Sequence, residues 1–185
     1  MDFNLIPAGA EPPKEVNAII EIPAQSSPVK YEADKKLGLL RVDRIMSAGL
    51  RYPQNYGFIP QTLARDGDPL DIIVIAPFEL ERLALIACRP VGLLNMTDQA
   101  GPDEKVIAVP IDSVCPATSH IRRLDDVGAY LLNQLQFFFE HYKLLEPGKW
   151  VKFEGWGDVK DAKRAIEAAI LAYAGHDGEP LQNGK

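Results

Sequence analysis

Residues 66–76 read DGDPLDIIVIA, a turn of carboxylates, glycine and proline followed by a run of apolar residues. The apolar part, Leu70–Ala76, is rich in β-branched side chains, which pack well on a pleated surface, and it predicts a β-strand. Gly67 and Pro69 keep the preceding turn from being helical. The segment therefore predicts a strand with an acidic turn at its entrance.

Similar β-rich segments recur on both sides of this strand. They are residues 18–22, 39–45, 83–88, 91–96, 106–109 and 150–156. Pro90 and Gly92 interrupt the longest stretch and predict a bend or a bulge there. Short strands at regular spacing, separated by glycine and proline turns, predict a mainly β (α+β) fold built on a small barrel.

Two segments have the spacing of amphipathic helices. Apolar residues recur at steps of four and three in the first, at Leu131, Leu135, Phe138, Tyr142 and Leu145. We expect this helix to begin near residues 125–126 and to end before Pro147, and an alanine-rich second helix to cover 159–174. The expected organisation is one domain over 1–185, with an extended arm at 1–17 and a loose tail at 175–185.

Composition and charge exclude several classes of protein. The 185 residues hold 26 acidic and 20 basic side chains, a formal charge of −6, which opposes binding to nucleic acid. No apolar run is long enough to span a membrane, and the first residues carry no basic region, so we expect no signal peptide. Two cysteines and no CxxC motif favour a reduced, cytoplasmic protein, in which any metal would have oxygen ligands.

Two acidic turns are the strongest local signals. Asp66, Asp68 and Asp71 crowd within six residues, and two like charges about 4 Å apart repel by roughly 4 kcal/mol at an effective dielectric near 20. Such crowding fits either an acidic surface turn or a site for a hard cation, although the spacing does not match an EF-hand. A turn at 101–102 can bring Asp98 and Asp103 together beside a lysine, as a cation clip or as a plain loop.

Aromatic and basic residues form a third group of signals. Tyr52 and Tyr56 lie in the loop RYPQNYGF at 51–58 and are either hydroxyl donors or hydrophobic cover. Arg44 ends a half-polar strand and faces either water or an anion, and Tyr142 is either core packing or a donor at the rim. The chain contains no GxxxxGK[ST], GxGxxG or GxSxG motif.

Four blocks of the sequence together closely resemble one family. They are EIPAQSSPVKYE (21–32), RIMSAGLRYPQNYGFIPQTLARDGDPLD (44–71), RPVGLLNMTDQAGPDEK (89–105) and FFEHYKLLEPGKWVKFEGW (138–156). In this order they resemble the soluble family I inorganic pyrophosphatases of bacterial type, from about residue 3 to about residue 174.

The resemblance implies a single domain around a five-stranded OB-like β-barrel with two flanking helices. It also implies Mg²⁺-dependent hydrolysis of inorganic pyrophosphate to two orthophosphates by direct attack of a metal-activated water. Several Mg²⁺ ions would bind per active site, with Mn²⁺ as a substitute. The expected assembly is a homohexamer, a dimer of trimers, with no nucleic acid or membrane partner.

The resemblance also implies roles for individual residues. Asp68 would be the general base, with Arg44, Tyr142 and Lys143 as further catalytic groups. The metal ligands would be Asp66, Asp71, Asp98, Asp103 and Glu21. Pyrophosphate would bind to Lys30, Arg44, Tyr56, Lys105, Tyr142 and Lys143, and Glu32 and Tyr52 would line the cavity.

The charges of these residues predict how the substrate enters. Seven carboxylates and four cationic side chains leave the empty pocket at −3, whereas two Mg²⁺ would bring it to +1 and three to +3. The metal-free pocket would repel a polyanion, so we expect pyrophosphate to enter as a metal complex.

The chain departs from the pattern at the expected subunit contact. Phe137 stands where some relatives have histidine, and Ser27 stands where some have an acid that holds an interface metal. The hexamer remains the expectation, with its own dependence on pH and metal.

Three alternatives stay open at this stage. One is a Mg²⁺-dependent phosphatase or nucleotide pyrophosphatase that acts on larger esters. The second is an OB-like barrel that binds nucleic acid without catalysis, which the acidic charge opposes. The third is a calcium-binding module, which leaves Lys30, Arg44 and Lys143 without a purpose.

Overall fold

The computed structural model describes residues 2–35 and 37–175. Its strands are β1 (Val16–Ile22), β2 (Val29–Asp34), β3 (Leu39–Ile45), β4 (Asn55–Phe58), β5 (Asp71–Val74), β6 (Leu85–Asp98), β7 (Gly101–Pro110) and β8 (Val151–Gly157). The α-helices are α1 (Ala129–His141) and α2 (Val159–Gly175), and short 3-10 helices cover Phe3–Leu5, Pro116–Thr118 and Leu124–Asp126. In the described part of the chain, neither helix combines the length and apolarity needed to cross a bilayer.

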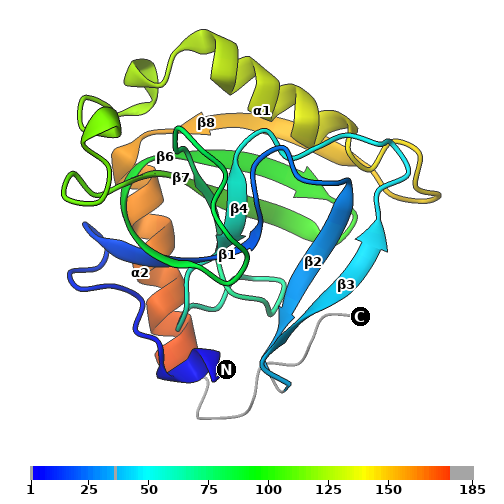
Figure 1. Ribbon diagram of the computed structural model, residues 1–185. Helices are drawn as coiled ribbons and strands as arrows, with labels where there is room; N and C mark the ends of the chain where they lie inside the picture. Colours follow the sequence, from blue (N-terminus) through cyan, green and yellow to red (C-terminus); the bar gives the residue numbers. More distant parts are fainter. Residues whose placement is uncertain (1, 36, 176–185) are drawn as a thin grey trace.

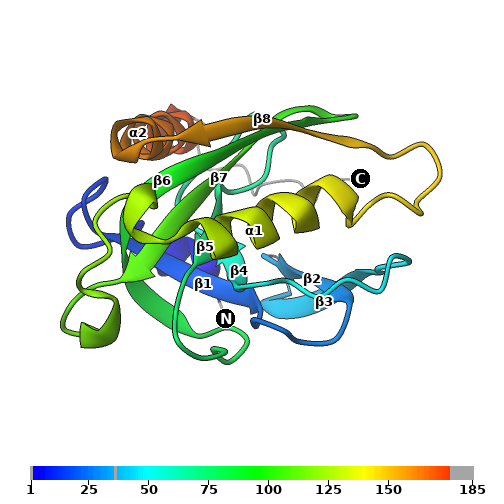
Figure 2. The ribbon, with the colours of Figure 1, turned by 90° about the horizontal axis from the view of Figure 1, so that it is seen from above.

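Five strands close into a ring (Figures 1 and 2). Their order is β1, β4, β5, β7 and β6, and β6 pairs again with β1 to close the circle. The β5–β7 pair is parallel, whereas the other pairs in the ring are antiparallel. β8 extends the sheet beside β6, with α1 packed near β8 and α2 near β6. The predicted mainly β fold with a five-stranded OB-like barrel and two flanking helices is confirmed.

Successive side chains of β5 pack into two different cores. Ile73 belongs to the cluster that contains Leu135 of α1, whereas Ile72 and Val74 pack with Ile166 of α2. Side chains alternate between the two faces of a strand, and here a helix covers each face. For this reason the strand is continuously apolar instead of alternating between apolar and polar residues.

The strand β4, which the sequence pattern did not predict, lies very close to β1. A Cβ added at Gly57 would lie 1.9 Å from the carbonyl oxygen of Ile19, so only glycine fits there without a backbone shift. Gly57 is paired with Ile20 of β1 and Ile72 of β5. This close approach holds the neighbouring Tyr56 at its place in the barrel wall.

The segments predicted at 83–88 and 91–96 form one long strand, β6 at 85–98, with a bulge. The register of β6 against β7 shifts between Pro90 and Gly92, as the sequence predicted. A Cβ at Gly92 would meet the side chain of Leu124 at 2.3 Å, so this side chain occupies the space beside the bulge. The bulge lets one strand contribute to the barrel at one end and carry Asp98 at the other.

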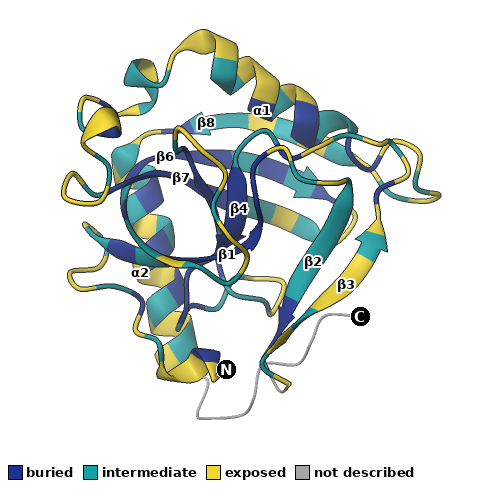
Figure 3. Cartoon of the chain, in the orientation of Figure 1, coloured by how far each residue is buried: buried dark blue, intermediate teal, exposed yellow. Residues whose placement is uncertain are grey.

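The strands β2 and β3 form a separate two-stranded ribbon (Figure 1). Its outer strand is largely exposed (Figure 3). The range of β3 matches the prediction, whereas β2 was not predicted. The sequence of β2, VKYEAD, alternates apolar and charged residues, which is the pattern of a strand with one polar face. The ribbon presents this polar face to the candidate site.

The first helix differs from its prediction at both ends. Asp126 accepts hydrogen bonds from the backbone N–H groups of Arg122 and Arg123, at 2.9 and 3.1 Å, and so caps the short 3-10 helix instead of α1. The α-helix begins at Ala129 and ends at His141, so Leu145 lies beyond it and is 63% exposed. The predicted apolar stripe is therefore buried only as far as Tyr142.

The two ends of the chain relate differently to the predictions. Within the expected extended arm, Phe3–Leu5 is a 3-10 helix, and Phe3 packs edge-on against Phe58 with 5.9 Å between the ring centres. The second helix runs as predicted, with one residue more. Apart from Gly175, which ends α2, the expected loose tail lies outside the described residues.

Candidate active site

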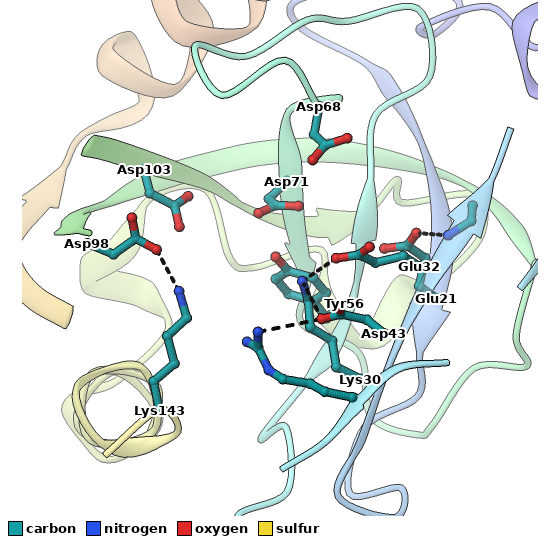
Figure 4. A network of polar contacts seen from close by, with 12 residues as sticks. Glu21, Lys30, Glu32, Asp43, Tyr56, Asp68, Asp71, Asp98, Asp103 and Lys143 are labelled. Carbon is teal, nitrogen blue, oxygen red and sulfur yellow. Dashed lines mark hydrogen bonds and ion pairs between the residues drawn. The ribbon is translucent and has the colours of Figure 1, made fainter. Parts of the chain in front are cut away.

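One polar cavity of about 320 Å³ opens between the ribbon, the loop before β5, the β6–β7 hairpin and the segment after α1. Twelve of the residues singled out from the sequence line it: Glu21, Lys30, Glu32, Tyr56, Asp66, Asp68, Asp71, Asp98, Asp103, Lys105, Tyr142 and Lys143. In the view of Figure 4, the carboxylates of Asp98 and Asp103 lie on one side and those of Glu21 and Glu32 on the other, with Asp71 between them. Segments far apart in the sequence thus contribute to one site.

The loop before β5 has a fixed shape. The backbone N–H of Asp68 donates to Oδ1 of Asp66 at 3.1 Å, and Gly67 adopts a φ of 91°, a conformation that favours glycine. Below the loop, the hydroxyl of Thr62 accepts from the backbone N–H of Leu70 at 2.9 Å. Together these bonds present Asp66 and Asp68 to the cavity just before Asp71 begins the strand.

The hairpin between β6 and β7 brings the second pair of acids together. Asp98 ends β6 opposite Gly101, and Asp103 lies opposite Met96 two residues farther along the ladder. The turn itself lies at residues 99–100, and Gly101 and Pro102, where the sequence predicted it, are the first residues of β7. The hairpin still brings both carboxylates to the cavity. In the same strand, Lys105 pairs across the parallel ladder with Asp71 of β5.

Lysine ammonium groups contact most of the acids. Nζ of Lys105 lies 2.5 Å from Asp71 and 2.9 Å from Asp103, and it donates to the hydroxyl of Tyr56 at 3.2 Å. Lys143, which follows α1, lies 2.6 Å from Asp98, as Figure 4 shows.

The ribbon contributes three further contacts of this kind, through two lysines. Lys30 is bonded to Glu32 and lies 3.4 Å from Asp43. Lys35 lies 3.5 Å from Asp68. Positive charge is therefore distributed among the carboxylates from several sides of the cavity.

The pKa values show which acids remain poorly compensated. Burial raises the pKa of Glu21 to about 8, and the charge of Asp71 acts in the same direction. Burial and Asp71 also raise the pKa values of Asp66 and Asp103. Burial alone would raise the pKa of Asp98 as well, but Lys143 holds it below its usual value. Repulsion is thus centred on Asp71.

Lys105 and Tyr56 keep their protons. Burial opposes the charge of Lys105, but Asp103 and Asp71 outweigh burial and hold its pKa well above the usual range. Burial raises the pKa of Tyr56 well above its ordinary value, so its hydroxyl stays protonated. The cavity therefore offers fixed hydrogen-bond donors beside its acids.

Two of the residues expected at the site are not among the lining residues. Tyr52, expected at the wall, is buried one layer behind and packs against Tyr56 with 4.9 Å between ring centres and a tilt of 48° between the rings. Arg44 lies beside the cavity, where its guanidinium contacts Glu146 and Asp43. The aromatic loop thus supports the site through packing as well as through the hydroxyl of Tyr56.

Four charged residues line the cavity that were not singled out from the sequence: Asp34, Lys35, Arg41 and Asp43. All belong to the ribbon or to the turn that joins its strands. The alternation of Lys30, Glu32 and Asp34 on one face of β2 was the signal that could have found the first of them. No comparable pattern marks Lys35, because its position depends on how the ribbon folds over the barrel.

Known proteins supply an independent comparison. A family model described as "Inorganic pyrophosphatase" matches residues 18–174. An inorganic pyrophosphatase from Ralstonia nicotianae is 54% identical over 173 residues, which cover 94% of this chain and 99% of that relative. Among solved structures, an inorganic pyrophosphatase from Coxiella burnetii has a TM-score of 0.88 and 48% identity, covering 91% of this chain and 99% of the other.

A second solved structure, an inorganic pyrophosphatase from Thermus thermophilus, has a TM-score of 0.89 and 41% identity, covering 94% and 99% of the two chains. The ring of five strands is the barrel of an OB-like enzyme, and the charged cavity between barrel, ribbon and helix is its candidate active site. The chain belongs to the inorganic pyrophosphatase family, a family of hydrolases.

Proposed function

We propose that this protein hydrolyses inorganic pyrophosphate to two orthophosphates in a Mg²⁺-dependent reaction, by direct attack of water and without a covalent intermediate. The observation that carries the proposal is the composition of the cavity. Of the described residues that line it, nine are carboxylates and five are cationic, a formal charge of −4. Such a mixture suits a substrate that is itself a complex of phosphate oxygens and hard cations.

The donor groups fit a hard divalent cation by their chemistry. Carboxylate oxygens are the ligands that Mg²⁺ and Mn²⁺ prefer, and the raised pKa values of Asp66 and Asp103 reflect crowding that a cation would relieve. Among the described residues, no three acidic, histidine or cysteine side chains converge closely enough to hold one ion together. Asp71 and Asp103 instead both contact the ammonium of Lys105.

We assign the metal ligands to Asp66, Asp71, Asp98, Asp103 and Glu21, with Mg²⁺ as the physiological ion and Mn²⁺ as a substitute. When bound, the ions would neutralise phosphate charge and lower the pKa of the attacking water. On binding, Lys105 and Lys143 would exchange their carboxylate partners for phosphate oxygens of the substrate. Both lysines are nearly fully buried, so little water competes for them.

We assign the remaining roles from the sequence motifs, and the positions of these residues in or beside the cavity support the assignment. Asp68, near Lys35, would accept or hold the proton of the attacking water. Lys30, Lys105 and Tyr56 would bind the phosphate that is attacked. Arg44, Tyr142 and Lys143 would stabilise charge on the leaving phosphate.

The charge of the cavity controls substrate entry in this proposal. At −4, or −3 with Glu21 protonated, the cavity repels a polyanion until divalent cations enter. Activity should therefore disappear in excess chelator and return when Mg²⁺ is restored. We expect the substrate to bind as its metal complex.

A phosphate-release assay tests the proposed function directly. The wild-type protein is incubated with pyrophosphate, ATP or a phosphate monoester, each with Mg²⁺ and with excess chelator. We expect rapid release from pyrophosphate with Mg²⁺ alone, and little from the other two substrates. Faster hydrolysis of ATP or the monoester would favour a general phosphatase, and substantial turnover in chelator would remove the metal from the mechanism.

We further propose a cytoplasmic homohexamer, a dimer of trimers. Large apolar residues are exposed along α1 and after it: Tyr130, Phe137, Leu144, Leu145 and Trp150. Phe137 stacks on His141 with 4.2 Å between ring centres, which makes a flat surface for a partner subunit. Sedimentation equilibrium measures the mass of the assembly, and a monomer at micromolar concentration would contradict the proposal.

A further inference from the structure

The guanidinium of Arg44 is held beside the cavity by three neighbours. Its Nε lies 3.1 Å from Oε1 of Glu146, and its Nη1 lies 3.5 Å from Asp43. Its Cζ lies 5.9 Å from the centre of the Tyr142 ring. Arg44 is also paired across the ribbon with Lys30, which lines the cavity. The arginine therefore borders the site without belonging to its inner wall.

Glu146 is itself rigidly placed. Its backbone N–H donates to the carbonyl oxygen of Lys143 at 2.9 Å, and its own carbonyl accepts from the N–H of Lys149 at 3.2 Å. Its side chain is 11% exposed, and its second carboxylate oxygen lies 3.2 Å from Nζ of Lys149. The backbone hydrogen bonds of this turn therefore hold the carboxylate of Glu146 beside Arg44.

The Arg44–Glu146 contact links two separate walls of the site. Arg44 belongs to the ribbon, which has no strand pairing with the barrel sheet in the described part of the chain. Glu146 belongs to the turn that directly follows Tyr142 and Lys143, which line the opposite side. The ion pair therefore fixes the distance between phosphate-binding groups on the two walls.

Within the described chain, the ion pair leaves two guanidinium nitrogens of Arg44 without a hydrogen-bond acceptor. Among the described residues, Nε and Nη2 of Arg44 and Oε1 of Glu146 are buried without a partner of hydrogen-bond geometry. The two side chains attract through charge at 3.1 Å, but they are not aligned for a hydrogen bond. A buried guanidinium nitrogen without an acceptor is suited to take a phosphate oxygen.

We propose that Glu146 is a positioning residue, which acts through Arg44 and does not contact the substrate. It holds the long arginine side chain in one orientation, with its free nitrogen available to an anion. Without Glu146 the remaining carboxylate partner is Asp43, on the neighbouring position of the same strand, and the arginine turns back toward the ribbon. This inference rests on the proposed function, because Arg44 is assigned there to the leaving phosphate.

Steady-state kinetics on pyrophosphate tests the proposal. Glu146→Gln keeps the shape of the side chain and removes its charge, so kcat/KM should fall by about 10-fold, as misplacement of a catalytic contact commonly produces. Lys149→Met is the matched control, because it removes only the more exposed partner of Glu146 and leaves the backbone hydrogen bonds of the turn in place. It should change kcat/KM less than twofold. Glu146→Asp, which keeps the charge but shortens the side chain, should be intermediate.

A double-mutant cycle separates positioning from a structural effect. In the Arg44→Lys background, Glu146→Gln should lower kcat/KM less than twofold further, because the planar group it orients is gone. An equal loss in both backgrounds, or full activity of Glu146→Gln, would overturn the proposal. Thermal unfolding of each variant monitors the fold, and the Asp variant serves if the Gln variant does not fold.

Binding of inorganic phosphate, measured by calorimetry with Mg²⁺, supplies a readout independent of catalysis. Affinity should fall in Glu146→Gln and stay near the wild-type value in Lys149→Met. If the wild type binds phosphate in this pattern but does not cleave pyrophosphate, the proposed function fails while the positioning role stands. If the wild type cleaves pyrophosphate and both variants match it in rate and affinity, the positioning role fails alone.

Discussion

Asp71 and Lys105 are paired across the parallel strands β5 and β7, and the ammonium of Lys105 lies 2.5 Å from Oδ2 of Asp71. The same ammonium lies 2.9 Å from Asp103, and the residue Lys105 is 2% exposed. One strand pairing thus places a buried cation between two acids that come from different segments. In the proposed mechanism these three groups bind both the metal and the phosphate.

Neutralising Asp71 should abolish most of the activity without unfolding the protein. Asp71→Asn keeps the size of the side chain but removes a proposed metal ligand, so kcat should fall about 100-fold or more, the scale for losing one preorganised electrostatic group. Stability should change little, because the lost contact with Lys105 is offset by weaker repulsion of Glu21, Asp66 and Asp103.

Phosphate release and thermal unfolding measure the two effects in that variant. Asp125→Asn is the matched control, because the side chain of Asp125 is 80% exposed and its ion pair in the described part of the chain is with Arg123, at 3.6 Å. It should retain wild-type activity. Near-normal turnover by Asp71→Asn at saturating Mg²⁺ would remove Asp71 from the metal site.

Glu21 should make the metal-free protein less stable as the pH rises. Its pKa is raised from 4.5 to about 8 in the folded state, because burial disfavours its charge. Between these pH values the unfolded chain has released a proton that the folded chain retains. The free energy of unfolding therefore falls with pH, by up to about 1.4 kcal/mol per pH unit from this group.

Glu21→Gln removes this dependence, so the stability of the variant relative to wild type should increase between about pH 5 and pH 8. Urea denaturation in chelator at several pH values measures the difference. Glu15→Gln, a half-buried residue before β1 that does not line the cavity, is the control. A flat difference for Glu21→Gln would show that Glu21 is ionised in the metal-free fold.

Gly57→Ala should destabilise the barrel at the β1–β4 crossing. The added methyl would overlap the carbonyl oxygen of Ile19 at 1.9 Å, and two backbones must separate to admit it. We expect a loss of about 2–4 kcal/mol in the free energy of unfolding. Gly175→Ala is the control, because among the described residues a methyl there meets no atom within 4 Å outside its chain neighbours and its own helix.

Urea unfolding measured by circular dichroism compares the two glycine variants. Because Gly57 is next to Tyr56, activity of the surviving folded protein should fall as well. Equal stability of Gly57→Ala and wild type would mean that β1 and β4 can separate at little cost.

The parts of the fold with strong local patterns could be predicted from the sequence. The second helix, β3 and the bulge in β6 were all located from periodicity and from the positions of glycine and proline. β2 and β4 were not predicted. β4 has a weak local pattern, because it is only four residues long and includes a glycine. The start of α1 was misplaced because Asp126 has the composition of a helix cap but caps a different turn.

The candidate site divides in the same way. The types of residue and most of their positions followed from the motifs, since acids crowded at 66–71 and 98–103 are visible locally. The partners of those residues were not visible. Strand register and the position of the ribbon decide these contacts. They include Lys105 with Asp71, Tyr52 behind Tyr56, and Arg44 with Glu146.

By itself, the sequence determined the chemistry of this protein: an acidic, strand-rich chain whose motifs carry carboxylates, lysines and tyrosines in a fixed order. Only the tertiary structure decided which carboxylate lies beside which lysine or arginine. Closing the ring brings distant segments together. Asp71 and Lys105, for example, are 34 residues apart in the sequence. An electrostatic interaction depends on distance and burial in space, and separation along the chain specifies neither.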